Sequence, residues 1–227
     1  MRKNNEDTEV LKGIETIKNL EKKDVLESEE QIKLVQSSLQ NNNSGVNSAT
    51  QKVNYIDKFS NSLIMGDSRA ESISVYGILN NSSVIAYKGR NLVTAIKNGD
   101  INKAANLSPK NIFLTYGMND ITVYGSSDDF IKEYEIFIKQ LQDKLPNSKI
   151  YVNSIFRVSN KTLQKSKSYS NISKFNIALE DMCNRLGITY IDASSCVKEN
   201  LFEKDGIHFK PQFSKDWLNL LIQKANL

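Results

Sequence analysis

The sequence is poor in the residues from which many small proteins build their sites, with two cysteines, one histidine and three prolines among 227 residues. A structural zinc site needs about four cysteine or histidine ligands, so this class of site is excluded. Hydrophobic residues make up 39% and charged residues 25%, which excludes collagen, a disulfide miniprotein and a wholly disordered chain. Cys183 and Cys196 could form a disulfide or could both be buried thiols, and their spacing leaves both alternatives open.

Long apolar runs are also missing. No window approaches the roughly 18 consecutive apolar residues of a membrane helix, so we expect no membrane span in this chain. The first thirty residues lack the apolar core of a signal peptide. The location is not fixed by these features. If residues 1–50 are a spacer from which an anchor was removed, an extracellular or cell-surface location is favoured over a cytoplasmic one.

The net charge of +4 is unevenly distributed along the chain. Residues 1–50 contain seven basic and nine acidic residues, whereas the remaining 177 residues contain 23 and 17. The basic excess of this second part is scattered and does not alternate with aromatic residues, as a nucleic-acid groove would require. We therefore expect no nucleic-acid partner.

Aromatic residues are absent before Tyr55, and residues 1–40 are rich in Glu and Lys. Apolar residues in this part recur at spacings of three and four, which predicts a helix with a narrow apolar stripe: Val10, Ile14, Ile17, Ile32, Val35 and Leu39. The Asn/Ser/Gly run at 41–45 predicts a linker. We interpret 1–50 as a charged helical appendage and 51–227 as the main domain. The appendage could pack on that domain, self-associate as a short coiled coil or stay loose.

After Tyr55, short runs with β-branched or aromatic residues alternate with longer amphipathic stretches. The runs predict strands at 62–65, 83–87, 111–116, 149–155 and 188–191. The stretches predict helices near 91–98, 127–143, 170–186 and 212–225. In the second helix six residues share one face, with Ile136 out of place: Phe130, Ile131, Tyr134, Phe137, Ile138 and Leu141. This alternation predicts an α/β fold with a parallel sheet, whose ligands bind at the carboxyl ends of the strands.

The first expected strand is followed by the string GDSRAES, residues 66–72. If a helix begins there, Ser68 lies at its N-terminus, where backbone N–H groups face any developing anion. This placement suits a nucleophile. The alternative is that Asp67 or Ser68 only caps the helix.

Three further strings follow later strands or precede the last helix. Gly89, in the turn 87–91, and Asn119, after the third strand, could each offer an N–H donor or could serve only their turns. His208 is the only histidine, so any imidazole chemistry falls to it. Asp205, with Gly206 between, can fold back onto the ring and fix its tautomer.

The order Ser, Gly, Asn, His, with the strings GDSR, GMND and DGIH, resembles the SGNH (GDSL-like) hydrolase family, and more narrowly its bacterial GDSR-type members. The resemblance covers about 55–227. It implies a three-layer α/β/α sandwich, the flavodoxin-like SGNH hydrolase fold, with a parallel sheet of about five strands. It also implies a nucleophile, base and orienting acid at Ser68, His208 and Asp205. The oxyanion hole would use Ser68, Gly89 and Asn119, and neither a metal nor an organic cofactor is implied.

The sequence departs from the family pattern in two places. Arg69 replaces the leucine of the namesake motif, and it could contact an anionic substrate or pair with Glu71 or another acid. The segment 154–158 lacks the proline expected after the fourth strand. Candidate substrate contacts are Arg69, Tyr116, Met118 and Arg157. The chain has no GxSxG elbow, which disfavours an ordinary α/β-hydrolase.

The resulting hypothesis is a serine esterase that hydrolyses a short acyl ester, such as an O-acetyl group on a carbohydrate, through an acyl-enzyme. The hydrophilic segments 121–129 and 159–170 are candidates for lining the cleft, and they favour a polar substrate. The alternatives are an acyltransferase with the same triad and a non-catalytic glycan- or partner-binding domain of this fold. A nucleotide-binding flavodoxin-like protein fits less well, because the chain lacks a glycine-rich phosphate loop.

Overall fold

The chain divides into two units, residues 1–52 and 53–227, and the computed structural model describes the second. The helix and linker predicted for residues 1–50, and self-association through them, lie outside the described residues. Among residues 53–227, no helix is both long enough and apolar enough to cross a membrane.

A parallel five-stranded sheet with the order β2-β1-β3-β4-β5 forms the centre of the described unit. Its strands are β1 (Ser62–Gly66), β2 (Val84–Ala86), β3 (Asn111–Thr115), β4 (Lys149–Asn153) and β5 (Thr189–Ile191). Every residue of β1 is buried, as expected for a central strand covered on both faces. The α/β class and the five predicted strands are confirmed.

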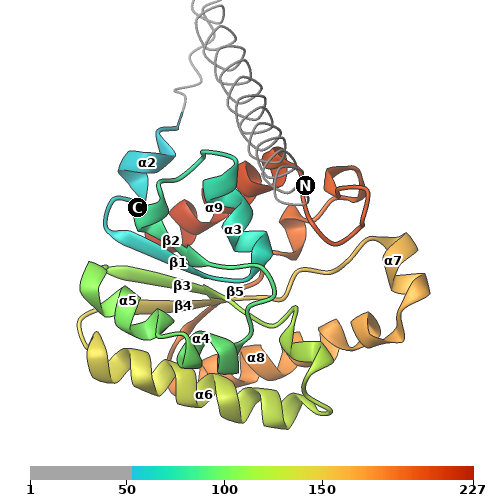
Figure 1. The fold of residues 1–227 in the computed structure, drawn as a ribbon, viewed down its shortest axis with the longest axis horizontal. Helices are drawn as coiled ribbons and strands as arrows, with labels where there is room; N and C mark the ends of the chain where they lie inside the picture. The colour runs from blue at the N-terminus through green and yellow to red at the C-terminus, as the bar shows by residue number, and fades with distance from the viewer. Residues whose placement is uncertain (1–52) are drawn as a thin grey trace, which may run out of the picture. The chain divides into compact units, whose positions relative to one another are not determined.

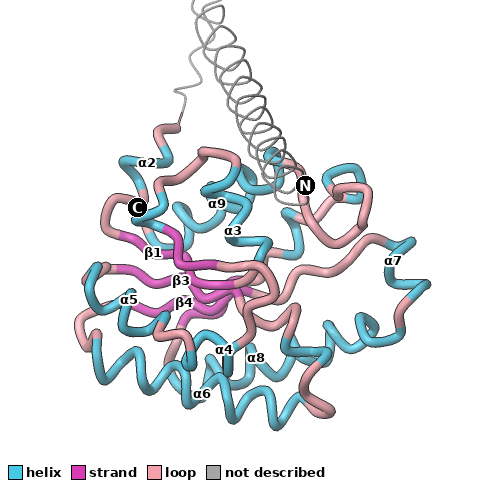
Figure 2. Tube along the Cα trace, viewed as in Figure 1, coloured by secondary structure: helices cyan, strands magenta, loops and turns pink. Residues whose placement is uncertain are grey.

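Helices cover both faces of the sheet and give three layers (Figure 1). One face carries α2 (Tyr55–Lys58), α3 (Ser68–Val75) and α9 (Pro211–Ala225). The other carries α4 (Leu92–Lys97), α5 (Asp100–Leu107), α6 (Ser127–Lys144) and α8 (Ile172–Leu186). A further short helix, α7 (Asn160–Lys165), lies on a long connection beyond the end of β4 (Figure 2). This is the three-layer sandwich that the family resemblance of the sequence implies.

The longest helix, α6, follows its predicted pattern. All six residues of the expected apolar face are buried, and Ile136, predicted to be out of place, is 48% exposed. The Ser126 side chain caps the helix by accepting a hydrogen bond from the backbone N–H of Asp129. The buried face packs against α5 and α8, so one apolar stripe joins three helices.

The observed elements differ from the predicted ones in several places. The helices α2 and α5 were not predicted, and the polar stretch 159–170 contains α7 and the start of a 3-10 segment, η3 (Lys167–Asn171). The strand β4 ends at Asn153, two residues before its predicted end. The chain leaves the sheet there because the backbone N–H of Ile155 donates to the Asn176 side chain of α8, at 2.7 Å.

Two apolar clusters lie on opposite faces of the sheet. Cys183, on α8, belongs to the cluster beneath α4, α5, α6 and α8, and Cys196 belongs to the cluster beneath α3 and α9. Both thiols are buried and neither forms a disulfide. Of the two alternatives left open by the sequence, buried thiols are the one that the structure adopts.

Candidate active site

The turn at residues 66–68, called the serine turn below, joins β1 directly to α3. Asp67 is the N-cap residue of α3, and its Oδ1 accepts a hydrogen bond from the backbone N–H of Arg69 at 2.9 Å. Because Asp67 caps the helix, the Ser68 hydroxyl is not used for capping. Within residues 53–227 the backbone N–H of Ser68 has no acceptor, so it is available to an anion at the helix N-terminus.

The loop before α9 places a carboxylate against the only imidazole. Asp205 Oδ1 accepts hydrogen bonds from the backbone N–H groups of Ile207 and His208, at 2.8 and 2.9 Å. Gly206 has a φ of +71°, and a Cβ there would collide with the Ser159 and Thr162 hydroxyl groups. Glycine is therefore required for the tight turn that directs Asp205 back to His208.

These two loops bring Ser68, His208 and Asp205 into one hydrogen-bonded chain. The Ser68 Oγ atom lies 2.8 Å from His208 Nε2, and His208 Nδ1 lies 2.6 Å from Asp205 Oδ2. An ionised carboxylate only accepts hydrogen bonds, so Nδ1 carries the proton and Nε2 accepts from the serine hydroxyl. A neutral imidazole oriented in this way can remove the hydroxyl proton.

The surroundings of Asp205 favour its ionised form. Burial by itself raises the pKa of this carboxyl group, but three hydrogen bonds act against burial. They come from the His208 ring and from the backbone N–H groups of Ile207 and His208, and together they lower the pKa below its usual value. Asp205 therefore stays charged at neutral pH and can stabilise a protonated His208.

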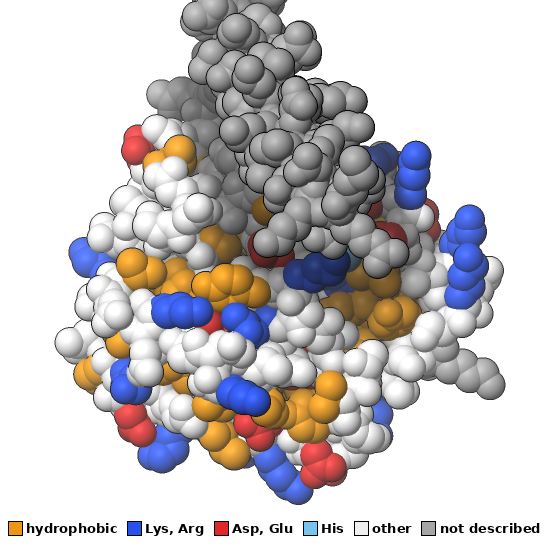
Figure 3. All heavy atoms as spheres, viewed as in Figure 1, with side chains coloured by type: hydrophobic (Ala, Val, Ile, Leu, Met, Phe, Trp, Pro, Cys, Tyr) orange, Lys and Arg blue, Asp and Glu red, His pale blue; other side chains and the backbone are white. Residues whose placement is uncertain are grey.

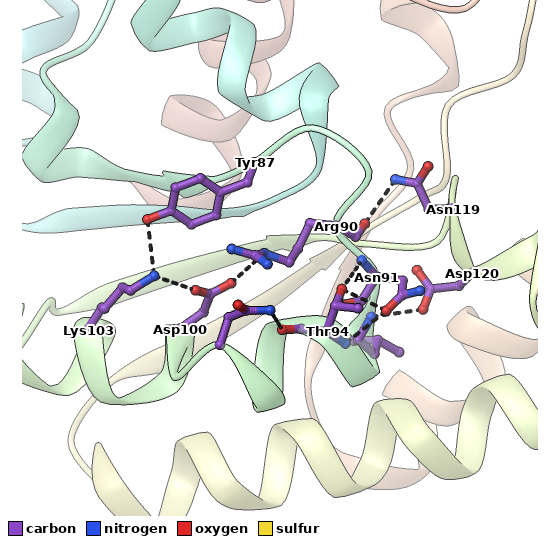
Figure 4. Close-up of polar contacts among 10 residues, drawn as sticks. Tyr87, Arg90, Asn91, Thr94, Asp100, Lys103, Asn119 and Asp120 are labelled. Carbon is purple, nitrogen blue, oxygen red and sulfur yellow. Dashed lines mark hydrogen bonds and ion pairs between the residues drawn. The ribbon is translucent and has the colours of Figure 1, made fainter.

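The turn after β2 and the loop after β3 supply the other predicted donors. Gly89 has a φ of +73°, and the turn is closed by a hydrogen bond from Arg90 N–H to the Tyr87 carbonyl. Within the described residues the Gly89 N–H has no acceptor. The Asn119 Nδ2 atom donates to the Arg90 carbonyl at 2.9 Å, which joins the two loops and leaves its second hydrogen free (Figure 4).

Asp120 is a buried residue of this region for which the sequence analysis proposed no role. Its Oδ1 accepts a hydrogen bond from the backbone N–H of Leu92, at the start of α4, at 3.0 Å. Burial raises its pKa to about 7, although hydrogen bonds from Leu92 and Gly117 act in the opposite direction. The only signal in the sequence was its position directly after Asn119.

Arg69 lies in the interior beside the serine turn, with 3% of its surface exposed. Its guanidinium donates to the carbonyl groups of Phe156 and Arg157, and it lies 5.4 Å from the ring centroid of Phe209. Burial lowers its pKa to about 10, so the side chain is still charged at neutral pH. Within the described residues Arg69 forms no ion pair with Glu71 or with another acid, and such a pairing was one of its two predicted roles.

The other candidate substrate contacts occupy different positions. Tyr116 and Met118 are buried in the apolar cluster, where the Tyr116 ring packs edge-on against Phe137. Arg157 is half-exposed and pairs with Glu199, with 2.9 Å between Nη1 and Oε2. The structure therefore groups Ser68, Gly89, Asn119, Asp205 and His208 on loops at one sheet edge, while the predicted substrate contacts lie in the interior or in an ion pair.

Two hollows lined by residues of the described unit border these loops. A cavity of about 10 Å³ lies behind the serine turn, between Asp67, Arg69, Tyr116 and Phe156, and is large enough for about one water molecule. A hollow of about 340 Å³ lies beside Asp205 and has mostly polar or charged walls, including Lys161, Lys165, Glu203 and Lys204. Basic and acidic side chains and apolar patches are interspersed over the described face in Figure 3. Residues 53–227 contain no group of three or more His, Cys, Asp or Glu that could hold a metal.

This fold, with a hydroxyl, an imidazole and a carboxylate hydrogen-bonded at the carboxyl edge of a parallel sheet, is typical of serine-type acyl hydrolases. Residues 47–215 match the model of the GDSL-like lipase/acylhydrolase family, and the chain belongs to this family. A search of curated proteins finds no significant match to this sequence. The protein is a carboxylic ester hydrolase of this family.

Solved structures support the fold. A GDSL-like lipase from Bacteroides thetaiotaomicron is 15% identical with a TM-score of 0.59, covering 77% of this chain and 92% of the lipase. A carbohydrate esterase of family 3 from Talaromyces cellulolyticus is 16% identical with a TM-score of 0.56, covering 73% and 95%. A peptidoglycan O-acetylesterase is 16% identical with a TM-score of 0.54, covering 63% of this chain and 45% of its own.

Proposed function

We propose that the protein hydrolyses a short acyl ester on a polar, carbohydrate-like substrate through a covalent acyl-enzyme on Ser68. The observation that carries this proposal is the hydrogen-bonded chain from Ser68 Oγ through His208 to Asp205, with distances of 2.8 and 2.6 Å. A serine hydroxyl is a weak nucleophile unless an adjacent base accepts its proton. His208 is in the correct tautomer and within reach to do so.

Acylation begins when His208 Nε2 takes the Ser68 proton while Oγ forms a bond to the ester carbonyl carbon. The carbonyl oxygen becomes an oxyanion, which the N–H groups of Ser68 and Gly89 and the Asn119 amide stabilise. Asp205 stabilises the protonated imidazole. The carbon–oxygen bond to the alcohol then breaks, and His208 returns the proton to the leaving oxygen.

Deacylation repeats these steps with water. His208 removes a proton from water as the water oxygen attacks the acyl carbon, and the same donors stabilise the second oxyanion. The bond to Oγ breaks, the proton returns to Ser68, and the carboxylic acid leaves. Every proton transfer in the cycle passes through His208.

The surroundings of the serine turn favour a short acyl group and a polar alcohol. The cavity lined by Asp67, Arg69, Tyr116 and Phe156 next to the serine turn measures about 10 Å³, which is too small for a long acyl chain. The hollow beside Asp205 has the mixed charged and hydroxyl-bearing walls that suit a hydrated carbohydrate rather than a lipid. The likeness in fold to a carbohydrate esterase and to a peptidoglycan O-acetylesterase agrees with this choice.

The first test is intact mass after incubation with a fluorophosphonate, comparing wild type with Ser68→Ala. We expect a single adduct on wild type and none on the variant, since only an activated serine displaces the fluoride. Ser72→Ala, on the next turn of α3, is the matched control and should still be labelled. Absence of an adduct on folded wild-type protein would contradict the proposed role of Ser68.

The second test compares p-nitrophenyl acetate with p-nitrophenyl octanoate and measures acetate released from an O-acetylated oligosaccharide. We expect kcat/KM for the acetyl ester to exceed that for the octanoyl ester by at least about tenfold, because the cavity lined by Asp67 and Arg69 cannot take the longer chain. A preference for octanoate would contradict the short-acyl assignment. Product analysis with an added sugar acceptor tells water from a sugar hydroxyl as the acyl acceptor.

A further inference from the structure

A fully buried carboxylate, Asp100, lies outside the candidate triad. It is the first residue of α5, and its side chain has no exposed surface. Its Oδ2 is 2.9 Å from Arg90 Nε and its Oδ1 is 2.9 Å from Lys103 Nζ. A buried charge is costly unless it is paired, so these two cations determine whether the carboxylate is tolerated there.

The same two cations contact one aromatic ring. The Arg90 guanidinium lies 4.4 Å from the ring centroid of Tyr87, and Lys103 Nζ lies 4.7 Å from it. Lys103 Nζ is also 3.3 Å from the Tyr87 hydroxyl. Figure 4 shows Asp100 between Arg90 and Lys103, with Tyr87 alongside. Asp100 thus anchors both side chains that flank the turn of Gly89.

The backbone of this anchored turn contacts the predicted oxyanion donors. The Arg90 carbonyl accepts the hydrogen bond from Asn119 Nδ2, and the Arg90 N–H closes the turn onto the Tyr87 carbonyl. A shift of Arg90 therefore moves the Gly89 N–H and releases the Asn119 amide at the same time. Donors act on an oxyanion only when they are held about 2.7–3.1 Å from it, so such a shift weakens both.

We propose that Asp100 is a positioning residue, which holds the loop 87–91 through Arg90 so that Gly89 and Asn119 stay aligned as oxyanion donors. The inference rests on the proposed function. Asp100 touches neither the substrate nor the triad. By aligning these donors, Asp100 stabilises the transition state, in which negative charge develops on the carbonyl oxygen. It does not strengthen binding of the substrate in the ground state.

The test is Asp100→Asn, which keeps the shape of the side chain and removes its charge. We expect kcat for p-nitrophenyl acetate to fall by about tenfold, less than for loss of a whole donor, with KM within about twofold of wild type. Glu135→Gln is the control, because it removes the carboxylate partner of Arg185 on the outer surface of α6. The control should retain wild-type kcat. An unchanged kcat in Asp100→Asn would overturn the inference.

A double-mutant cycle separates positioning from general destabilisation. If Asp100 acts through the oxyanion donors, Asp100→Asn should cost less in an Asn119→Ala background than in wild type, about threefold or less. An equal cost in both backgrounds overturns the inference. Should Asp100→Asn fail to fold, Arg90→Gln breaks the same pair from the other side and is expected to lower kcat similarly. A wild-type kcat in that variant also overturns it.

The proposed function and the positioning role of Asp100 would fail in different experiments. If wild type shows no ester turnover and no fluorophosphonate adduct, the proposed function is wrong. If wild type is active and Ser68→Ala is not, but Asp100→Asn retains wild-type kcat, only the positioning role is wrong. Thermal unfolding of each variant establishes that the kinetic comparison is made on folded protein.

Discussion

At the scale of single residues, Asn119 is the proposed oxyanion donor whose surroundings are best defined. One of its amide hydrogens is used by the Arg90 carbonyl, and the other is free. Asn119→Ala should lower kcat by about 10²–10³-fold, because a donor to the developing oxyanion is lost. Asn98→Ala is a matched control, since Asn98 donates to the Thr94 carbonyl at the exposed end of α4. Steady-state ester hydrolysis checks both, and wild-type turnover in Asn119→Ala would contradict the assignment.

Asp120 gives a prediction about pH. Its pKa is raised to about 7 in the folded chain, whereas an unperturbed aspartate has a pKa of about 3.9. The folded state therefore holds a proton that the unfolded state releases, so this residue makes folding less favourable as pH rises from about 4 to about 7. One pKa unit corresponds to about 1.4 kcal/mol.

The experiment is urea unfolding of wild type and Asp120→Asn between pH 4 and pH 8. The asparagine does not titrate, so the stability difference should move in favour of the variant across that window and level off above about pH 7. Groups that titrate independently of Asp120 cancel in the difference. A difference that is the same at every pH would show that the carboxyl group is already ionised at pH 4 in the folded chain.

At the scale of elements, Arg69 joins three segments that meet at the site. From α3 it reaches the carbonyl groups of the 154–158 segment and the ring of Phe209, the neighbour of His208. This segment lacks the proline expected there, and the hydrogen bonds from Arg69 restrict it instead. A planar guanidinium can donate to two carbonyl groups at once, which a lysine ammonium cannot do in the same geometry.

Arg69→Leu should therefore lower kcat by about tenfold or more, since the histidine loop loses its contact with the serine turn. We expect Arg69→Lys to restore little of this activity. Lysine restores the positive charge, but it lacks the planar guanidinium that donates to two carbonyl groups at once. Arg185→Leu is the control, as Arg185 pairs with Glu135 on the surface. Ester kinetics and thermal unfolding measure the outcome. Full activity in folded Arg69→Leu would contradict the role of Arg69 in holding the histidine loop against the serine turn.

Helices whose apolar residues recur at a clear helical period were predictable from the sequence. Elements that depend on tertiary contacts were not. The α6 pattern was visible because six apolar residues repeat along 18 residues. The helix α5 has no side-chain N-cap to mark its start, and it lies between Gly99 and Ser108, both in left-handed conformation. The sequence could indicate Ser68, Asn119 and His208 by their motifs. It could not indicate that Asp100, which precedes Asn119 by 19 residues, anchors Arg90.

At the scale of the whole unit, the parallel sheet decides which residues can meet. The carboxyl ends of β1, β2 and β3 place Ser68, Gly89 and Asn119 on adjacent loops, because β1 lies between the other two strands. The same sheet separates its two apolar clusters. Cys183 lies in one and Cys196 in the other, so the five strands stand between the two thiols.

This separation predicts the thiol chemistry of the unit. Burial raises the pKa of Cys183 to about 12 and also raises that of Cys196, so neither forms the reactive thiolate near neutral pH. We expect a thiol reagent such as Ellman's reagent to react slowly with native protein and to titrate two thiols per chain in denaturant without reductant. Reductant should leave the melting temperature unchanged. Fewer than two thiols under those conditions would mean that the cysteines are paired, which requires a different arrangement of α8 about the sheet.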